Sequence, residues 1–549
     1  MTLAIDFGTS NTVVARWNPV EQRPETLELK GLALRQGDSP ALVPSLVYVE
    51  DGAIAQVVAG QMVRDRGLDG LTNGRLFSNF KRGIGTAVWG FVPELDGVAV
   101  GCDRVGQWFL GALGGAIAVD WPDLLTAGND SQLILTVPVD SFEAYRHWLT
   151  RAIAETPLGQ CDRVRLIDEP TAAALGYGKG NCEKVLVVDF GGGTLDLALV
   201  QRPRSATRSA QGGGSAAQKP LGFLLRWGGQ AVTSDAQPQT TAQVLAKAGL
   251  NLGGADLDNW LMDHFTETQG TAPDRLVARM VERLKVRLST ETEAQEVYFD
   301  ADALDTVELA LTRSRFEQIL RDRGFFEQLD GAMGSVLQQA RRQGIAPDDI
   351  EAVLLVGGTS QIPAVRAWLE TYFPADKIAG DRPFEAVAWG ALQLSQGTDL
   401  KDFLYHGYGI RYWNHREKCH GWHPIIDKGQ PYPMAEPVEL VLGASVENQP
   451  SLELVIGELG EAQTAMEIFF EGDRLVTRSS QSGSSAAVQP LNDRDGARSL
   501  APLDPPGSPG SDRVRVRFQV DRDRQLRVTI DDLLTDRTLL DDQALVQLS

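Results

Sequence analysis

One short pattern occurs twice in this chain and limits what the chain can fold into. The N-terminus reads MTLAIDFGTSNTVVARW, and residues 185–200 read VLVVDFGGGTLDLALV. In each copy an apolar strand ends in an aspartate, Asp6 or Asp189, and small residues lead directly into a second strand. A single glycine-rich turn of this kind is an ordinary hairpin. Two copies predict two related subdomains that close on one ligand from opposite sides.

The residues at the two turns suit a phosphate-bearing ligand. Glycines allow backbone N–H groups to approach an anion that side chains would block. A carboxylate beside them suits a hydrated Mg²⁺ ion, because that ion keeps several waters and takes few protein oxygens. Two further glycine sites, NLGGADLDNWL at 251–261 and VLLVGGTSQIPAVRAWL at 353–369, follow strands and open helices, where backbone amides attract phosphate. We therefore expect a nucleotide with Mg²⁺.

The chain divides by its pattern into an α/β part and an all-β part. Up to about residue 400, β-rich runs such as LILTVPV alternate with helical stretches such as FEAYRHWLTRAIAE, which predicts an α/β architecture. Short alternating runs then take over and predict an all-β domain. We expect a nucleotide-binding domain at 1–396, a linker at 397–407 and a β domain at 408–549. Gly/Ser/Pro-rich stretches at 205–220 and 479–512 are expected to be flexible, the second a disordered insertion in the β domain.

Composition excludes several classes of protein. The net charge of −21 disfavours binding to nucleic acid or to an anionic membrane surface, since both need a basic face. No window is apolar enough for a membrane span, and the N-terminus lacks the features of a signal peptide. Four scattered cysteines without paired spacing are expected as free thiols. These features predict a cytoplasmic protein.

The segment LIDEPTAAALGYG at 166–178 resembles the signature of the heat-shock protein 70 (DnaK-like) family. The resemblance continues through LVPSLVYV, FKRGIG, LTVPVDSFEAYR, NLGGADLDNWLMDHF, VERLKVRLS, VGGTSQIP and EAVAWGAL, and more faintly through DLKDFL and VRVRFQVDRDRQLRVTI. It implies an actin-like ATPase domain of the duplicated ribonuclease H type, followed by a sandwich-like β domain that binds extended peptides. The implied ligands are ATP or ADP and Mg²⁺.

The resemblance also implies a role for individual residues. Asp6 and Asp189 would hold Mg²⁺ through waters. Lys81, in FKRGIG, matches the catalytic lysine, and positioning with electrostatics supplies most of the acceleration in phosphoryl transfer. The other implied catalytic residues are Glu169, Thr194 and Asp196. The implied nucleotide contacts are Gly8, Thr9, Ser10, Asn11, Gly191, Gly192, Gly193, Gly253, Gly254, Glu282, Lys285, Ser289, Gly357, Gly358, Thr359 and Gln361.

Two positions imply communication between the domains. Pro138 and Arg146 keep the eight-residue spacing at which the family couples nucleotide state to the β domain. A proline at this place is also ordinary turn chemistry. Arg165 matches a position that J-domain co-chaperones use, although residue 168 is Asp where Asn is usual. The linker sequence DLKDFLYHG breaks its apolar run at Tyr405 and His406, which indicates weaker coupling.

The sequence departs from the family pattern around the adenine ring. Gln361 stands where an arginine commonly lies against the base, so a cation–π contribution of about 0.5 to 2 kcal/mol is absent. Phe384 replaces the usual acid, and Val286 is aliphatic. We therefore expect weaker or different binding of the base, with the phosphate chemistry complete.

The expected β domain has its own peculiarities. Its first loop, YWNHREKCHGWHPII at 412–426, contains His415, Cys419, His420 and His423. This spacing admits a zinc site but lacks paired C-x-x-C ligands, so an ordinary polar loop is the alternative. The sequence printed here stops after the last expected strand, and we read it as a short, lidless member with faster peptide exchange.

Three functions follow as hypotheses. The first is an ATP-dependent chaperone that hydrolyses ATP to ADP and phosphate to control binding of unfolded clients, assisted by a J-domain co-chaperone and a nucleotide exchange factor. The second is a nucleotide-gated regulatory or interaction protein with little or no turnover. A small-molecule kinase of the same fold is a third, disfavoured because a β domain replaces a substrate-binding insertion. Fold alone does not choose among them.

Overall fold

The protein is described here from a computed structural model. The structure describes residues 2–35, 37, 39–71, 73–85, 88–90, 92–125, 131–139, 143–177, 182–202, 240–300, 305–396, 398–414, 419–459, 465–471, 474–480, 488–492, 499–522 and 524–548. The glycine-rich stretch at 205–220, expected to be flexible, lies outside these residues. Within the described part, no helix combines the length and the apolarity needed to cross a bilayer.

The first lobe is built on a mixed sheet that contains the N-terminal hairpin. β1 runs antiparallel to β2 and parallel to β11, which pairs in turn with β12. One face is covered by α2 (Cys102–Asp120) and α3 (Glu143–Ala154), whose apolar side chains complete a core with Leu3, Ile5 and Phe7. The strands are β1 (Thr2–Asp6), β2 (Asn11–Asn18), β3 (Arg23–Thr26), β4 (Val43–Pro44), β11 (Gln132–Val137) and β12 (Arg163–Asp168).

Smaller elements lie outside that sheet in the first lobe. A three-stranded sheet has the order β6-β5-β7, and β9 pairs with β10. Their bounds are β5 (Leu46–Asp51), β6 (Gln56–Ala59), α1 (Gln61–Asp65), β7 (Leu76–Ser78), β8 (Val88–Gly90), β9 (Glu94–Leu95) and β10 (Val98–Ala99).

The second lobe repeats the hairpin and its parallel neighbour. β13 runs antiparallel to β14 and parallel to β18, as β1 does with β2 and β11. Every residue of β13 after Lys184 is buried, because both faces of this sheet are covered. The sheet order is β19-β18-β13-β14-β15-β20-β23. The strands are β13 (Lys184–Phe190), β14 (Leu195–Gln201), β15 (Thr240–Leu250), β18 (Ala352–Val356), β19 (Ile378–Ala379), β20 (Thr398–Phe403) and β23 (Pro431–Tyr432).

Helices of the second lobe show the expected amphipathic spacing. In α6, Val277, Met280, Val281, Leu284 and Leu288 form one buried stripe. The side chain of Asp274 caps the first turn by accepting a hydrogen bond from the backbone N–H of Val277. The elements are α5 (Gly254–Gln269), α6 (Arg275–Leu288), the hairpin of β16 (Glu293–Asp300) and β17 (Asp305–Thr312), α7 (Arg313–Asp322), α8 (Phe325–Arg342) and α9 (Pro363–Leu369).

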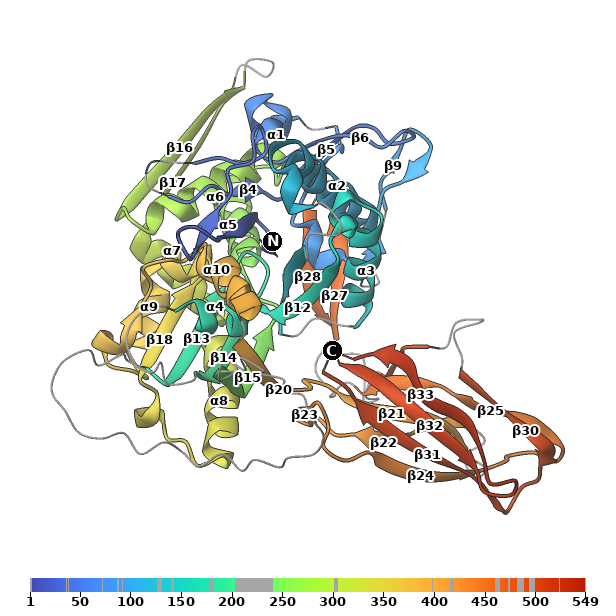
Figure 1. The fold of residues 1–549 in the computed structure, drawn as a ribbon. Helices are drawn as coiled ribbons and strands as arrows, with labels where there is room; N and C mark the ends of the chain where they lie inside the picture. Colours follow the sequence, from blue (N-terminus) through green and yellow to red (C-terminus); the bar gives the residue numbers. More distant parts are fainter. Residues whose placement is uncertain are drawn as a thin grey trace, which may run out of the picture.

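Two short helices pack between the lobes (Figure 1). α4 (Glu169–Gly176) and α10 (Ala386–Gln393) share a core with strands of both sheets. Small residues allow the close approach: a Cβ on Gly390 would lie 1.7 Å from the carbonyl oxygen of Ala172. The segment whose sequence carries the family signature is therefore a structural joint between the two halves.

The C-terminal part is all β, as the sequence predicted, and most of it extends from the β20 side of the second lobe, whereas its hairpin β27–β28 lies against the first lobe, where β27 pairs with β8 (Figure 1). Two four-stranded sheets, β22-β21-β26-β29 and β24-β31-β32-β33, contribute to a core that includes Tyr408 and Phe518. The strands are β21 (Gly407–Asn414), β22 (Cys419–Ile426), β24 (Val438–Gly443), β25 (Gln449–Leu454), β26 (Ile456–Leu459), β27 (Ala465–Glu471), β28 (Arg474–Ser480), β29 (Val488–Pro490), β30 (Ser499–Gly507), β31 (Asp512–Val520), β32 (Gln525–Asp532) and β33 (Arg537–Gln547).

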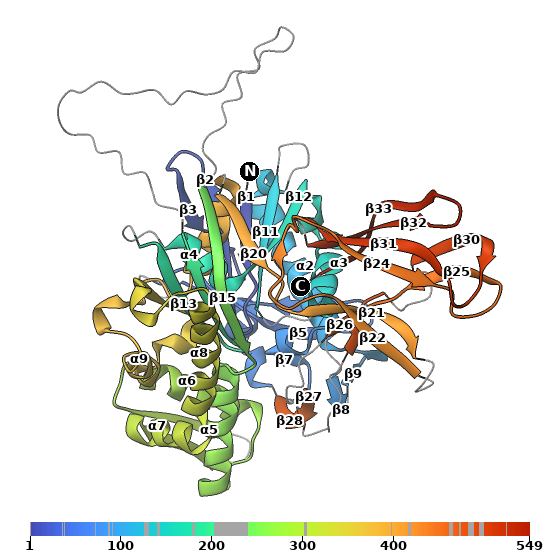
Figure 2. The same ribbon diagram turned by 90° about the horizontal axis from the view of Figure 1, so that it is seen from below.

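Two segments differ from what composition indicated. Within the predicted linker, residues 398–403 form β20, which lies beside β15 in a parallel pair (Figure 2). Within the stretch 479–512, predicted to be disordered, residues 499–507 form β30 and pair with β25. The prediction was wrong for β30 because its Ala501 and Leu503 alternate into the β core, which glycine- and proline-rich neighbours conceal in the sequence.

Candidate functional site

The two repeated turns meet each other in space. A Cβ on Gly192 would lie 2.1 Å from Oγ of Ser10, and one on Gly193 would lie 2.4 Å from Oγ1 of Thr9. The first turn is itself tight, since a Cβ on Gly8 would lie 2.1 Å from the carbonyl oxygen of Asn11. The β1–β2 and β13–β14 turns therefore form two sides of one cradle that exists only because side chains are absent.

The two other glycine sites converge on the same cradle. A Cβ on Gly253 would lie 2.5 Å from the backbone of Gly192, and the N–H of Ala255 donates to the carbonyl of Gly192 at 2.8 Å. Oγ1 of Thr359 donates to the carbonyl oxygen of Gly191 at 2.7 Å. Gly254 lies between these two sites, because its Cβ would be 2.8 Å from the Thr359 hydroxyl oxygen. Four segments far apart in the sequence thus surround one space.

The backbone of the glycine site at 357–358 requires glycine. Gly357 has φ of 79°, a left-handed conformation that side chains disfavour. A Cβ there would also lie 2.3 Å from the carbonyl oxygen of Phe190 and 2.9 Å from Oδ1 of Asp189. Next to it, Gly358 approaches the ring of Phe384, with 3.4 Å from its hypothetical Cβ to the nearest ring carbon.

Lys81 is a buried cation at the rim of this cradle. Its Nζ lies 2.8 Å from Oε1 of Glu169, and the two side chains are 7% and 10% exposed. The ammonium also lies 5.7 Å from the ring centre of Phe7 and 5.9 Å from that of Tyr145. Burial is the largest single effect and disfavours its charge, but Glu169, Tyr145 and Asp6 together outweigh burial, so the pKa of Lys81 is raised above its ordinary value.

Two buried aspartates, Asp189 and Asp196, and the partly buried Asp6 carry more negative charge than their surroundings compensate. Burial and the nearby Glu169 raise the pKa of Asp6 to about 7 and that of Asp196 to about 8. The same two causes, with Asp6 itself, raise the pKa of Asp189 well above its ordinary value. The hydroxyl of Thr136 donates to Asp6 at 2.7 Å. Asp196 accepts from the N–H of Val139 at 2.8 Å and from Thr194, while its buried Oδ2 has no hydrogen-bond partner among the described residues.

These residues fit a hydrated divalent cation with a phosphate chain. A cluster of carboxylates with raised pKa values calls for a cation, and the glycines allow the backbones of the four segments to approach one another closely beside it. Within the described ranges, no group of three or more His, Cys, Asp or Glu side chains is arranged to hold a metal ion by itself. Mg²⁺ retains water and takes few protein oxygens, so Asp6 and Asp189 could hold it through water.

The predicted nucleoside contacts share one face of α6 and its C-terminal cap. Glu282, Lys285 and Ser289 are partly buried and follow one another at helical spacing. Nζ of Lys285 donates to the carbonyl of Gly254 at 2.8 Å and pairs with Asp258 at 2.6 Å. Helix α6 is thereby tied to the glycine cradle through the start of α5.

The positions that depart from the family pattern lie on α6 and at the glycine site at 357–358. Val286 is 61% exposed, and Nε2 of Gln361 donates only to the neighbouring Ser360 hydroxyl, at 3.3 Å. Position 361 thus carries an uncharged amide.

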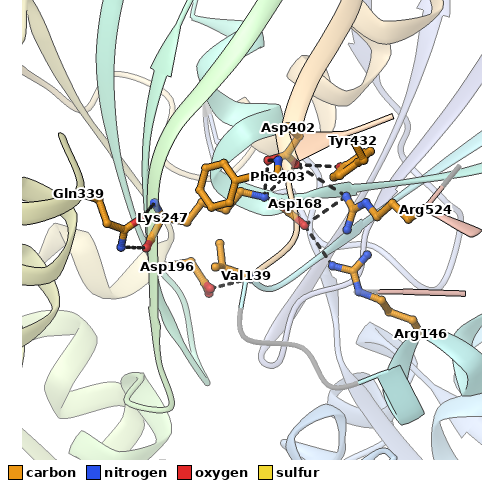
Figure 3. A network of polar contacts seen from close by, with 10 residues as sticks. All are labelled: Val139, Arg146, Asp168, Asp196, Lys247, Gln339, Asp402, Phe403, Tyr432 and Arg524. Atoms are coloured by element: carbon orange, nitrogen blue, oxygen red, sulfur yellow. Dashed lines mark hydrogen bonds and ion pairs between the residues drawn. The ribbon is translucent and has the colours of Figure 1, made fainter. Parts of the chain in front are cut away.

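The predicted relay residues join a larger polar network (Figure 3). Pro138 is buried at the end of β11, next to Val139, whose N–H bonds Asp196. Arg146 donates to Oδ1 of Asp168 at 3.1 Å, and both side chains are nearly inaccessible. Arg165 is exposed on β12.

Several site residues were missed by sequence reasoning. Arg82 makes two hydrogen bonds to Oδ1 of Asp256, each 3.0 Å, and thereby joins the first lobe to α5. Lys247 lies in the same network as Arg146. Its signal was available, since a lone lysine interrupts the apolar run of β15.

The histidine-rich segment at 412–426, predicted to be a loop, forms instead, in its described residues, the end of β21 and its partner strand β22. His415 is outside the described residues. The ring of His420 packs edge-on against Trp413 at 5.1 Å, and Cys419 is exposed. In the described part of the segment no metal-binding group is formed.

Comparisons with known proteins agree with this architecture. The sequence model of the Hsp70 protein family matches residues 131–204 and 240–404. A chaperone protein DnaK of Thermosipho melanesiensis is 25% identical over 558 residues, covering 97% of this chain and 78% of the relative. The DnaK of Thermosipho africanus is 27% identical over 426 residues, covering 73% and 61%, and that of Thermotoga maritima is 24% identical over 559 residues, covering 97% and 78%.

The chain is similar to DnaK-like members of the Hsp70 family over most of its length. The family match begins just before β11 and ends just after β20, so it includes the second hairpin, α4, both later glycine sites and the predicted linker up to residue 404. In this Hsp70-like protein, most of the predicted site residues therefore lie in the part of the chain that the family model matches.

Proposed function

We propose that this protein is an ATP-dependent chaperone whose α/β part is an actin-like ATPase and whose β part binds unfolded or extended polypeptide. One observation carries the proposal: four glycine segments and three uncompensated aspartates converge on one cradle beside a buried lysine. The relatives named DnaK support the chaperone assignment.

The backbone amides of both hairpin turns would hold the β- and γ-phosphates, with Thr9 and Ser10 on one side and residues 191–193 on the other. Asp6 and Asp189 would hold Mg²⁺ through water. When bound, that ion supplies positive charge that neutralises the phosphates. Glu282, Lys285 and Ser289 would meet the nucleoside.

Lys81 would support the attacking water and offset charge on the γ-phosphate, since a buried cation acts strongly in a site of low polarity. Glu169 holds the lysine in place through the 2.8 Å ion pair. Asp196 and Thr194 would orient the water, because they are hydrogen-bonded to each other at the turn of the second hairpin.

The β part would recognise peptide through backbone hydrogen bonds and apolar contacts. Pro138 and Arg146 would transmit nucleotide state, because Val139 contacts Asp196 while Arg146 contacts Asp168 near β20. A J-domain co-chaperone and an exchange factor are partners that this function would use.

Single-turnover hydrolysis of radiolabelled ATP tests the proposal, with Lys81→Ala as the inactive variant and an unfolded peptide as the stimulating client. We expect lysine-dependent release of phosphate to water that rises when peptide is added. Phosphate release that is equal in both proteins would exclude the ATPase function.

A second function is favoured by Gln361 and Phe384, which lie beside the glycine site at 357–358. It is a nucleotide-gated interaction protein with little turnover. Tight ADP binding and nucleotide-dependent peptide affinity without hydrolysis would select it over the chaperone ATPase.

A further inference from the structure

A cluster of buried charges lies where the two lobes, the predicted linker and the β part meet (Figure 3). Nζ of Lys247 on β15 lies 2.5 Å from Oδ2 of Asp168 and 2.7 Å from Oδ1 of Asp402. None of the three side chains is more than 2% exposed. Lys247 therefore bridges a carboxylate at the end of β12 to a carboxylate on β20.

The β part completes the cluster from the other side. The guanidinium of Arg524, at the turn before β32, lies 3.7 Å from Asp168 and 3.9 Å from Asp402. The hydroxyl of Tyr432 on β23 donates to Oδ2 of Asp402 at 3.0 Å, and Arg524 packs on the Tyr432 ring. Arg146 supplies a further cation at 3.1 Å from Asp168.

Lys247 is the group in this cluster that touches both carboxylates closely. Its backbone is fixed, because the Gln339 side chain on α8 accepts from its N–H at 3.2 Å and donates to its carbonyl at 2.8 Å. Its ammonium also lies 5.1 Å from the centre of the Phe403 ring. The side chain of Lys247 therefore extends from a fixed backbone to the neighbouring strand β20.

Removing one member of such a buried set costs more than removing a matched pair. An isolated buried charge loses its hydration without compensation, whereas loss of opposite charges together leaves less to compensate. Without Lys247, the Asp168 and Asp402 carboxylates would face each other with only the more distant guanidinium groups of Arg146 and Arg524. Asp168 also directly precedes Glu169, the partner of Lys81.

We propose that Lys247 and Asp168 form a charge-compensated clip that holds β20, and through Arg524 and Tyr432 the β part, against the second lobe. Lys247 is a positioning residue in this device, because it acts through Asp402 and touches no nucleotide-binding residue. Opening of the clip releases the linker strand. The proposal deepens the proposed function, on which its regulatory meaning rests.

Amide hydrogen exchange of the full chain tests the clip directly. In Lys247→Met we expect the amides of β20 to exchange at least about 10-fold faster, while those of β13 stay unchanged. In Lys247→Met/Asp168→Asn we expect exchange of β20 to slow again by at least about 3-fold. Lys401→Met, an exposed lysine on β20 itself, is the matched control and should behave as the unmodified protein.

Unchanged exchange of β20 in Lys247→Met would overturn the clip, and so would a double variant that exchanges as fast as the single one. Equal acceleration in β13 would indicate general destabilisation and also overturn it. If Lys247→Met does not fold, Tyr432→Phe removes only one hydroxyl. We expect exchange about 2- to 10-fold faster in that variant, and no change would contradict the proposal.

ATP hydrolysis by the unmodified protein is measured beside these experiments. Lysine-dependent protection of β20 without hydrolysis would retain the clip and reject the ATPase. ATP hydrolysis, together with β20 exchange that does not change in Lys247→Met, would support the ATPase and reject the clip.

Discussion

Nζ of Lys81 and Oε1 of Glu169 lie 2.8 Å apart, in a pocket from which solvent is almost excluded. The lysine comes from the 3₁₀ turn Phe80–Gly83 of the first lobe, and the glutamate opens α4 at the joint between the lobes. The pair therefore links the candidate catalytic cation to the helix that both sheets share. Its consequences for activity and for stability differ and are separately measurable.

Replacement of Lys81 by alanine should abolish turnover and weaken the ligand-free fold. We expect a loss of at least about 100-fold in the rate of ATP hydrolysis, because the offsetting cation is gone. The free energy of unfolding should fall by about 3 kcal/mol or more, since Glu169 is left buried without its partner. Stopped-time hydrolysis and urea unfolding measure the two effects. Glu169→Gln in the Lys81→Ala background should recover stability but not turnover, and recovery of both would contradict the assigned role.

Replacement of Gly253 by alanine should block the cradle. The added methyl would lie 2.5 Å from the backbone of Gly192 and Gly193, which has no side chain to move aside. We expect ADP affinity to fall at least about 10-fold by calorimetry. Gly331→Ala, on an exposed face of α8 with open space around it, should leave affinity unchanged and stabilise the helix slightly. Equal affinity in the two variants would show that the cradle tolerates a side chain.

Stability of the ligand-free protein should fall as pH rises. Asp6 has an ordinary pKa near 3.8 that is raised to about 7 in the fold, and the pKa of Asp196 is raised to about 8. The folded state therefore holds protons that the unfolded chain releases, so the stability they contribute is full below pH 3.8 and is lost through pH 7 to 8. Thermal unfolding between pH 5 and 8.5 should show a falling Tm.

Two controls identify the aspartates as the cause of that slope. Asp6→Asn should flatten the Tm curve, because one titrating group is removed. MgADP should raise Tm most at the alkaline end, where the carboxylates are charged and need a cation. A Tm that rises with pH in the ligand-free protein would contradict the pKa assignments.

Replacement of Gln361 by arginine should strengthen nucleotide binding. A guanidinium against the base would contribute about 0.5 to 2 kcal/mol, or roughly 2- to 30-fold in affinity. Calorimetry with ADP measures the gain, and Gln361→Met controls for side-chain length without charge. A loss of affinity in Gln361→Arg would mean that Phe384 and Val286 direct the base elsewhere.

The order of elements was predictable because local pattern dictates it. The division into α/β and all-β parts near residue 400 agrees with the structure, and the repeated hairpins at Asp6 and Asp189 do form matching strand pairs. β30 was not predicted because its apolar alternation consists of only two side chains, Ala501 and Leu503. These two are sufficient for a strand once a partner strand is present. The predicted linker contained the strand β20 for the same reason, since its pairing partner β15 lies about 150 residues earlier.

By itself the sequence determined where chemistry-bearing residues stand along the chain: two aspartates at strand ends, four glycine segments and one lysine in a recognisable motif. Glycine and aspartate at a strand end act on the neighbouring backbone, so their pattern can be recognised in the sequence without knowledge of the tertiary structure. Only the tertiary structure decided that Lys81 faces Glu169, that Arg82 bonds Asp256, and that Lys247 joins Asp168 to Asp402. Those pairings depend on burial and on distances between lobes. The strength of each charge interaction is therefore set by neighbours that are remote in the sequence.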